Sequence, residues 1–214
     1  MKSTLSKTQV DRLGDRLRRG RVEDDDLHLL DAYQQSFAEA YALVVGRIRS
    51  TLGLQPTGRP VVDGIREQEE TLRRSRDLFE DFIVVDRRER PSHGYRAVHV
   101  IVKSDDRLVE IQLRTVLQDF WAEFCERMSD FDPTIKYGGG DESDQWILSA
   151  TSDGVAEVES RERELLDLEG RFSRAPTRAL QARIEAARSS VEAQRKLLIE
   201  IISDNFPRLR GNGD

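Results

Sequence analysis

Two strand patterns joined by a tight turn lie in the middle of the chain and restrict its fold more than any other feature. Residues 95–103 form a strand pattern of mixed polarity, and residues 108–115 alternate between apolar and polar side chains. Asp105 and Asp106 stand between them as a turn, which predicts a β-hairpin. Because helical patterns lie on both sides of this hairpin, we predict a mixed α/β (α+β) fold with a small mixed β-sheet flanked by helices.

The neighbouring elements follow from apolar periodicity and from chain breakers. Apolar residues recur at spacings of three and four in a helix expected at 27–49. Gly53, Pro56, Gly58 and Pro60 then break the chain. We further expect a strand end at 61–62, a helix at 65–79, a strand at 82–86, a helix at 116–129 and a loop at 132–140.

The last third of the chain is expected to be helical from about 144 to 206, divided into two arms by Pro176. Apolar residues in both arms fall on a seam, which is weaker in the first arm and holds for three heptads in the second. This seam has two interpretations: a helical hairpin that packs on its own domain, or an oligomer interface. The seam residues are Val155, Val158, Leu165, Leu168 and Phe172, then Leu180, Ile184, Ala187, Val191, Gln194, Leu198 and Ile201.

Composition limits the classes of partner and compartment. The 214 residues are 35% charged, with a formal net charge of -6, which argues against a general nucleic-acid coat but still allows a local basic cleft for phosphates. Cys125 is the sole cysteine, so a disulfide within the chain is excluded and a reducing compartment is expected. No signal-peptide pattern or membrane-length apolar run is found, so we predict a cytoplasmic protein.

We expect three parts along the chain. Residues 1–26 are a charged N-terminal arm, either loose or a short helix; residues 27–140 form the globular domain; and residues 141–214 form a helical C-terminal extension. The histidines, His28, His93 and His99, are too scattered in sequence to suggest a metal-binding motif.

Three segments carry side chains suited to phosphate chemistry. In RPSHGYRAVHV (90–100), Gly94 allows unusual backbone angles and Tyr95 offers an aromatic face near several arginines, which suits a base and its phosphates. An ordinary β-turn with a core tyrosine explains the same pattern. In VEIQLRT (109–115), alternation sends Glu110, Gln112 and Arg114 to one face of a strand, which either lines a site or faces solvent. In IKYGGG (135–140), Lys136 beside glycines can reach a phosphate.

In this order, and with the WAE of residues 121–123 in the following helix, these segments resemble the RelA/SpoT-type (p)ppGpp synthetase domain over about residues 31–140. The resemblance implies a nucleotidyltransferase-like synthetase fold that transfers a pyrophosphoryl group from ATP to the 3′-hydroxyl of GDP or GTP. The products are ppGpp and pppGpp, the alarmones of the stringent response. The C-terminal helices resemble those through which many small single-domain synthetases assemble, so a homo-oligomer is expected.

The resemblance also implies a role for each matching residue. Tyr95, within the loop formed by His93, Gly94 and Arg96, is expected to stack on the guanine of GDP, GTP or (p)ppGpp. Glu110 is expected to be the catalytic carboxylate, which activates the 3′-hydroxyl or helps to hold Mg²⁺. The supporting positions of the guanine-nucleotide site are His99, Gln112, Arg114 and Lys136.

The resemblance fails on the ATP side. The family has a basic segment there, followed by a strand whose aspartate binds magnesium. Here the chain reads TGRPVVDGIREQ: Arg59 matches the first arginine, the following helix and most of the strand are missing, and Asp63 is not at the motif position. No lysine occurs between Lys7 and Lys103. Since phosphoryl transfer depends on metal and cationic clamps, we expect weak or absent catalysis, with ATP binding doubtful.

Three hypotheses remain at this point. The chain is an active pyrophosphokinase completed in some other way, a degenerate synthetase that still binds a guanine nucleotide, or an interaction protein that pairs with a complete synthetase through its C-terminal helices. A pyrophosphokinase acting on the 3′ end of tRNA is a further alternative, which the acidic net charge disfavours without excluding it.

Overall fold

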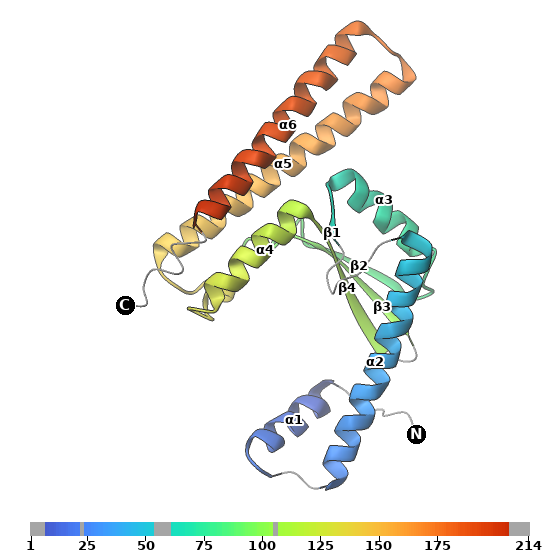
Figure 1. Ribbon diagram of the computed structural model, residues 1–214, viewed down its shortest axis with the longest axis vertical. Helices are drawn as coiled ribbons and strands as arrows, with labels where there is room; N and C mark the ends of the chain where they lie inside the picture. The colour runs from blue at the N-terminus through green and yellow to red at the C-terminus, as the bar shows by residue number, and fades with distance from the viewer. Residues whose placement is uncertain (1–6, 22–23, 54–60, 105–106, 206–214) are drawn as a thin grey trace.

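The computed structural model describes residues 7–21, 24–53, 61–104 and 107–205. In these ranges the chain forms a small sheet flanked by helices, with a long helical hairpin at one end and an arm that contains α1 at the other (Figure 1). The elements are α1 (Lys7–Arg18), α2 (Asp24–Leu52), β1 (Val61–Val62), α3 (Ile65–Arg76), β2 (Phe82–Asp86), β3 (Val98–Ser104), β4 (Arg107–Thr115), α4 (Val116–Ser129), the 3₁₀ turn η1 (Ile135–Tyr137), α5 (Glu142–Arg174) and α6 (Arg178–Asn205).

The sheet is mixed and has the strand order β1-β4-β3-β2. Strands β2, β3 and β4 are antiparallel neighbours, and β1 pairs in parallel with the last two residues of β4. The β3–β4 register runs from Val98 opposite Leu113 to Ser104 opposite Arg107. The predicted hairpin and the predicted fold class, a small mixed sheet flanked by helices with a helical C-terminal extension, are therefore confirmed.

Three predicted element bounds are wrong. Strand β3 begins at Val98 rather than at residue 95, because His93 and Gly94 adopt positive φ angles and the chain turns before it enters the sheet. Helix α3 ends at Arg76, three residues earlier than expected, because Phe79 leaves the helix to join the core under the sheet. Helix α2 runs from Asp24 to Leu52 and is three residues longer at each end than the helix predicted at 27–49. Helix α1 is a short helix of 12 residues, one of the two forms predicted for the N-terminal arm.

Alternation along the strands gives the sheet one apolar face and one polar face. Apolar residues of β3 and β4, such as Val100 and Leu113, pack against Ala40, Val44 and Ile48 of α2. The opposite face carries the side chains that alternate with them, including His99 and Glu110. Helix α2 therefore covers the apolar face of the sheet, and the polar side chains lie on the opposite face.

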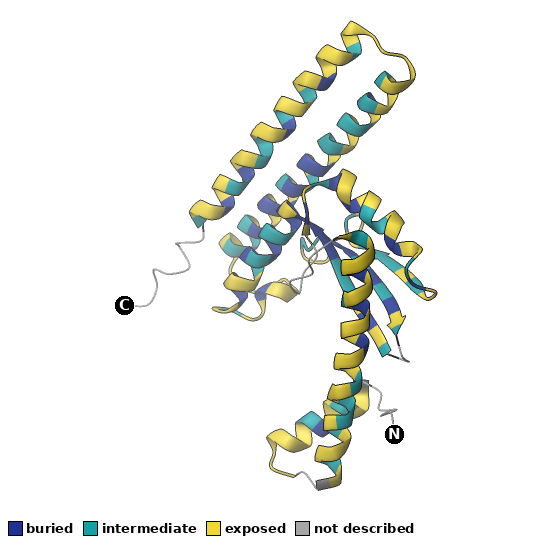
Figure 2. Cartoon of the chain, turned by 45° about the vertical axis from the view of Figure 1, so that its right-hand side comes forward, coloured by how far each residue is buried: buried dark blue, intermediate teal, exposed yellow. Residues whose placement is uncertain are grey.

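The C-terminal hairpin shares a second core with α4. Trp121 and Phe124 of α4 lie in one buried cluster with Val155 of α5 and with Leu198 and Ile202 of α6. Figure 2 shows the buried residues gathered where the hairpin meets α4 and the sheet, whereas the far end of the hairpin is mostly exposed or half-buried. Most of the seam predicted from the sequence thus packs within the chain, between α5 and α6, whereas its last residue, Ile201, is exposed. The break at Pro176 is confirmed.

None of the described helices is long and apolar enough to cross a membrane.

We predict that Leu198→Ala lowers the free energy of unfolding by about 2–5 kcal/mol, because it removes buried methyl groups from the core between α4, α5 and α6. Leu198 is 6% exposed and touches the backbone of α5 at Gly154. Chemical denaturation measures the change. Leu29→Ala is the matched control, since Leu29 is 45% exposed on α2, and its effect is expected to stay within about 0.5 kcal/mol. Equal effects of the two substitutions would contradict the packing described above.

Candidate functional site

Five of the residues predicted for the site meet in one hydrogen-bonded cluster on the polar face of the sheet. Tyr95 comes from the loop before β3, His99 from β3, and Glu110, Gln112 and Arg114 from alternate positions of β4. The Tyr95 hydroxyl lies 3.1 Å from His99 Nε2 and accepts a hydrogen bond from Arg114 at 2.9 Å. Glu110 Oε1 lies 2.7 Å from His99 Nδ1 and 3.1 Å from Gln112 Nε2.

A single assignment of protons satisfies all of these contacts. His99 Nδ1–H donates to Glu110, and His99 Nε2 accepts from the Tyr95 hydroxyl. One Nη of Arg114 donates both to the Tyr95 oxygen and to Gln112 Oε1, which lies 2.6 Å away. Gln112 Nε2 then donates to Glu110. The cluster is therefore consistent with a neutral His99 that holds the ionised Glu110 carboxylate by its Nδ1–H.

The environment of His99 favours this neutral form. Partial burial lowers the pKa of His99 below its ordinary value of 6.5, Glu110 opposes this effect, and the positive charges of Arg87 and Arg114 lower the pKa further. Glu110, by contrast, is about half exposed. The site thus presents an accessible carboxylate that is linked through Gln112 to the Arg114 guanidinium.

Arg114 is the buried cation of the cluster. Its side chain is 6% exposed, its guanidinium pairs with Asp119 at 3.0 Å, and it lies 5.2 Å from the centre of the Tyr95 ring. The Nε of Arg114 is buried without a hydrogen-bond partner. Asp119 was not among the residues predicted from the sequence. Its place in the first turn of α4, five positions after Arg114, is the signal that could have identified it.

Arg87 lies next to the site in the sheet. It follows β2, its backbone amide donates to the Ala97 carbonyl at 2.9 Å, and its positive charge lowers the pKa of His99. No role for Arg87 was predicted from the sequence. A phosphate bound on this face would meet positive charge from Arg87, directly after β2, and from Arg114 on β4.

The loop before β3 is held in an unusual backbone conformation. His93 has φ 49° and Gly94 has φ 81°, both in the left-handed region. A Cβ at Gly94 would lie 2.9 Å from Trp121 and 3.1 Å from Ser152, so only glycine fits here. A Cβ at Gly138 in the glycine run would likewise lie 2.8 Å from Nδ1 of the His93 ring. The glycine run therefore supports the loop by close packing.

Two predicted residues lie outside the cluster. Arg96 points to the opposite side of its loop, where it pairs with the buried Glu159 of α5 at 2.8 Å. Lys136 in η1 pairs with Glu126 of α4. The structure therefore brings Tyr95, His99, Glu110, Gln112 and Arg114 together, places His93 and Gly94 at the edge of that cluster, and directs Arg96 and Lys136 to carboxylates elsewhere.

The ATP side offers few candidate ligands among the described residues. Arg59 lies outside the described residues. Asp63 follows the two-residue strand β1, and its carboxylate accepts a hydrogen bond from Arg195 of α6 at 2.9 Å. Within the described ranges, no group of three or more His, Cys, Asp or Glu side chains could hold a metal ion. Mg²⁺ prefers six oxygen ligands, and Glu110 supplies one carboxylate that already accepts from His99 and Gln112. These residues do not build a magnesium site.

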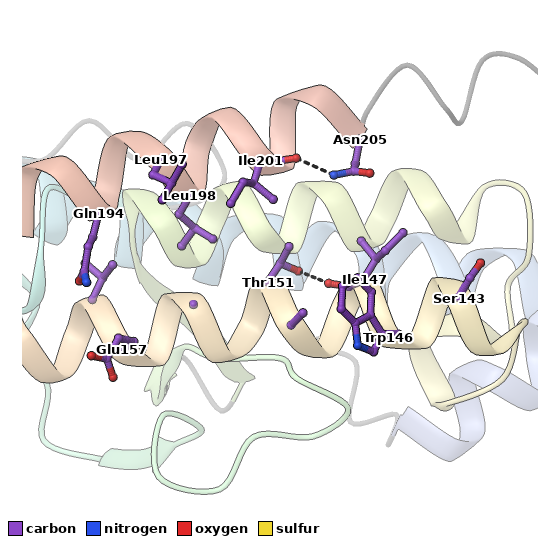
Figure 3. A pocket seen from close by; sticks show the side chains of 13 residues that line it. Ser143, Trp146, Ile147, Thr151, Glu157, Gln194, Leu197, Leu198, Ile201 and Asn205 are labelled. Atoms are coloured by element: carbon purple, nitrogen blue, oxygen red, sulfur yellow. Dashed lines mark hydrogen bonds between the residues drawn. The ribbon is translucent and has the colours of Figure 1, made fainter.

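A separate apolar cavity of about 710 Å³ lies between α5 and α6 (Figure 3). Ile147 and Val158 of α5 and Leu198 of α6 line it, and Trp146, Leu197 and Ile201 stand at its exposed rim. It lies on the C-terminal hairpin and shares no lining residue with the polar cluster on the sheet.

We predict that the NMR titration of His99 has a midpoint below 6.5, and that Glu110→Gln lowers it further by removing the neighbouring negative charge. A His99→Gln variant assigns the resonance. The unfolded state binds the proton more readily than the folded state, so the contribution of His99 to stability is lost as the pH falls below 6.5. The wild type should therefore lose more stability than His99→Gln between about pH 7 and pH 5. A midpoint at or above 6.5 would show that the ring is not buried as described.

Comparisons with known proteins agree with the resemblance seen in the sequence. Residues 57–129 match the model of the family described as "Region found in RelA / SpoT proteins". "Uncharacterized protein Rv1366" of Mycobacterium tuberculosis (strain ATCC 25618 / H37Rv) is 30% identical over 120 residues, and "Uncharacterized protein Mb1401" of Mycobacterium bovis (strain ATCC BAA-935 / AF2122/97) matches equally. The matched segment is 51% of this chain and 44% of each mycobacterial protein, so this chain spans less than half the length of these relatives.

Two solved structures show a limited likeness. The small alarmone synthetase 1 from Bacillus subtilis has 21% sequence identity and a TM-score of 0.37, over 63% of this chain and 76% of that one. The protein smu.1046c from Streptococcus mutans UA159 has 23% identity and a TM-score of 0.38, over 62% of this chain and 72% of that one. The likeness to the family rests on the matched region and on the motifs within it: residues 57–129 match the region found in RelA/SpoT proteins.

Proposed function

We propose that this chain binds a guanine nucleotide, GDP, GTP or (p)ppGpp, on the polar face of its sheet, and that it is a weak or inactive member of the (p)ppGpp synthetase family. The observation that carries this proposal is the single cluster of Tyr95, His99, Glu110, Gln112 and Arg114. Three separate segments of the chain converge there. The family resemblance implies that each of these residues acts on the acceptor nucleotide.

The chemistry of the cluster suits such a ligand. The Tyr95 ring has the flat apolar surface on which a guanine stacks. Arg87 and Arg114 provide positive charge for phosphates. Glu110 is exposed and ionised, and both of its hydrogen bonds within the cluster use Oε1. A ribose hydroxyl beside Glu110 could therefore donate its proton to this carboxylate.

In the family reaction, the 3′ oxygen of the acceptor forms a bond to the β-phosphorus of ATP, and the bond from that phosphorus to the α-phosphate oxygen breaks. AMP leaves, and the hydroxyl proton goes to the base, for which Glu110 is the candidate here.

The ATP side supports weak or absent transfer. Asp63, the nearest carboxylate after β1, is engaged by Arg195 on α6. The chain has no lysine between Lys7 and Lys103. Charge neutralisation supplies most of the catalytic effect in phosphoryl transfer. A site without cations and metal ligands for ATP would therefore bind the acceptor nucleotide but transfer pyrophosphate to it slowly or not at all.

Two other functions compete with this proposal. An active pyrophosphokinase, acting on a free nucleotide or on the 3′ end of tRNA, would need ATP ligands from residues 54–60 or from another chain. An interaction protein would use the C-terminal helices and leave the polar cluster without a ligand. The converging cluster favours nucleotide binding over the second of these alternatives.

The test of the proposal combines binding and transfer. GDP and ppGpp are expected to bind the wild type, and Tyr95→Ala is expected to weaken binding about 10- to 100-fold, because a stacked base contributes ~1–3 kcal/mol. Isothermal titration calorimetry measures this, with Tyr137→Ala as the control, since Tyr137 is 78% exposed on η1 and lies outside the cluster.

Transfer is measured with ATP labelled at the β-phosphate, magnesium, and GMP, GDP or GTP. Little or no labelled product is expected. Labelled (p)ppGpp that disappears in Glu110→Gln would overturn the inactivity and show a working ATP site. Absence of both binding and transfer would leave the interaction protein as the remaining function.

We also propose a cytoplasmic homo-oligomer assembled through α5 and α6. The support is the apolar rim of the hairpin cavity formed by Trp146, Leu197 and Ile201, which lies on the exposed side of the helices. Exposed apolar patches of this kind mark interaction surfaces.

We predict that Leu197→Glu shifts the protein to a smaller species in sedimentation velocity, because a buried carboxylate at the rim of the cavity disfavours association. Leu43→Glu is the matched control: Leu43 is 50% exposed on α2, and Leu197 is 56% exposed on α6. A wild type that sediments as a monomer, or an equal effect of the two substitutions, contradicts assembly through this surface.

A further inference from the structure

We propose that one face of α5 positions the nucleotide loop, residues 92–96, and that Ser152 and Glu159 are its positioning residues. This inference rests on the proposed function, because it concerns the loop that carries Tyr95. It assigns to the C-terminal extension a part in nucleotide binding that is separate from assembly.

The loop needs support from outside its own segment. His93 and Gly94 are consecutive residues in the left-handed region, which for a residue other than glycine costs about 1 kcal/mol or more. Within the loop, the Tyr95 amide donates to the Ser92 carbonyl, and these two residues form an isolated β-bridge. One such turn does not by itself direct the Tyr95 side chain toward His99, so contacts from other elements must select this conformation.

Helix α5 supplies those contacts on both sides of Tyr95. The Ser152 hydroxyl donates to the carbonyl of Gly94 at 2.7 Å, and the Glu159 carboxylate accepts from the Arg96 guanidinium at 2.8 Å. The residue before Tyr95 is thus held through its backbone, and the residue after it is held through its side chain. Tyr95 is fixed between two attachments to the same helix.

The spacing on α5 explains why one helix can make both contacts. Ser152 and Glu159 are seven residues apart, which places them two turns apart on one face. Val155 lies between them on this face and is fully buried in the core shared with α4. Packing therefore fixes this face of α5, and Ser152 and Glu159 contact the loop at a constant distance from each other.

The Glu159 carboxylate is itself held by a buried polar network. Its second oxygen accepts from Gln118 of α4 at 2.6 Å, and Gln118 accepts from Gln68 of α3 at 2.8 Å. Gln68 also donates to the Leu113 carbonyl of β4 and accepts from Arg88. Glu159, Gln118 and Gln68 are each no more than 2% exposed.

This network joins the loop to the strand that carries the rest of the site. Leu113, whose carbonyl it binds, directly precedes Arg114. The loop with Tyr95 and the end of β4 with Arg114 are therefore attached to one hydrogen-bonded frame. A buried and fully satisfied network of this kind rigidifies the elements that it joins, which would keep the Tyr95 ring in place before a nucleotide binds.

The experiment removes each attachment in the full-length chain. Ser152→Ala deletes the hydroxyl that binds the loop, Ser152→Thr restores a hydroxyl, and Glu159→Gln removes the charge that pairs with Arg96. Ser149→Ala and Glu164→Gln are the matched controls, because both residues are exposed on α5. Two quantities are measured for each variant: hydrogen exchange of the Tyr95 amide by NMR, and the affinity for GDP by calorimetry.

We expect about tenfold faster exchange at Tyr95 and about tenfold weaker GDP binding in Ser152→Ala and Glu159→Gln, as for the loss of one hydrogen bond to a charged or backbone group. Exchange in β3 and β4 should change much less, whereas general destabilisation would accelerate it equally. Recovery in Ser152→Thr supports the role of the hydroxyl.

Failure of the positioning role and failure of the proposed function give different results. Unchanged Tyr95 exchange in folded Ser152→Ala and Glu159→Gln would overturn the positioning role, whatever the affinity. If the wild type does not bind GDP, the proposed function fails, and the exchange measurement still decides whether α5 positions the loop. Faster exchange with unchanged GDP affinity would overturn the link between the loop and binding.

Discussion

The guanidinium of Arg114 is the interaction on which the candidate site depends. A buried cation is tolerated only when hydrogen bonds and an opposite charge replace its water. Arg114 obtains these from Asp119, the Tyr95 hydroxyl and Gln112. Each partner belongs to a different segment, so satisfying one charge fixes the loop before β3 and the start of α4 relative to β4. His99 and Glu110 then complete the cluster from the neighbouring positions of the sheet.

The C-terminal hairpin is part of the same structural unit as this site. Helix α5 packs on α4 through Trp121, whose indole donates to the Leu148 carbonyl, and through the buried cluster around Val155. It also contacts α3, where Glu162 accepts a hydrogen bond from the first backbone amide of the helix, at Ile65. Burial raises the pKa of Glu162 above its ordinary value. The pair of helices that the sequence predicts as a C-terminal extension thus packs against both α3 and α4.

The likeness to known proteins covers only part of this chain. The family match covers residues 57–129, and the mycobacterial relatives are more than twice as long as the segment that they share with this chain. Tyr95, His99, Glu110, Gln112 and Arg114 form one continuous cluster, whereas β1 is a two-residue strand followed by an aspartate that pairs with Arg195.

The sequence by itself determined the sheet and most of its helices. Alternation in residues 108–115 placed Glu110, Gln112 and Arg114 on one face, because the side-chain period of a strand is two. Pro176 divided the terminal helices, because proline cannot continue a helix.

The tertiary structure decided which predicted residues meet. Arg96 and Lys136 stand in the family motifs beside Tyr95 and the glycine run, yet their charges are taken by Glu159 and Glu126, which no local pattern connects to them. Asp119 joined the site for the same reason, through a buried Arg114 that required an anion. Apolar periodicity depends on residues that are close together in the sequence. The pairing of buried charges depends instead on which helices and strands the core brings together, and this arrangement exists only in the folded chain.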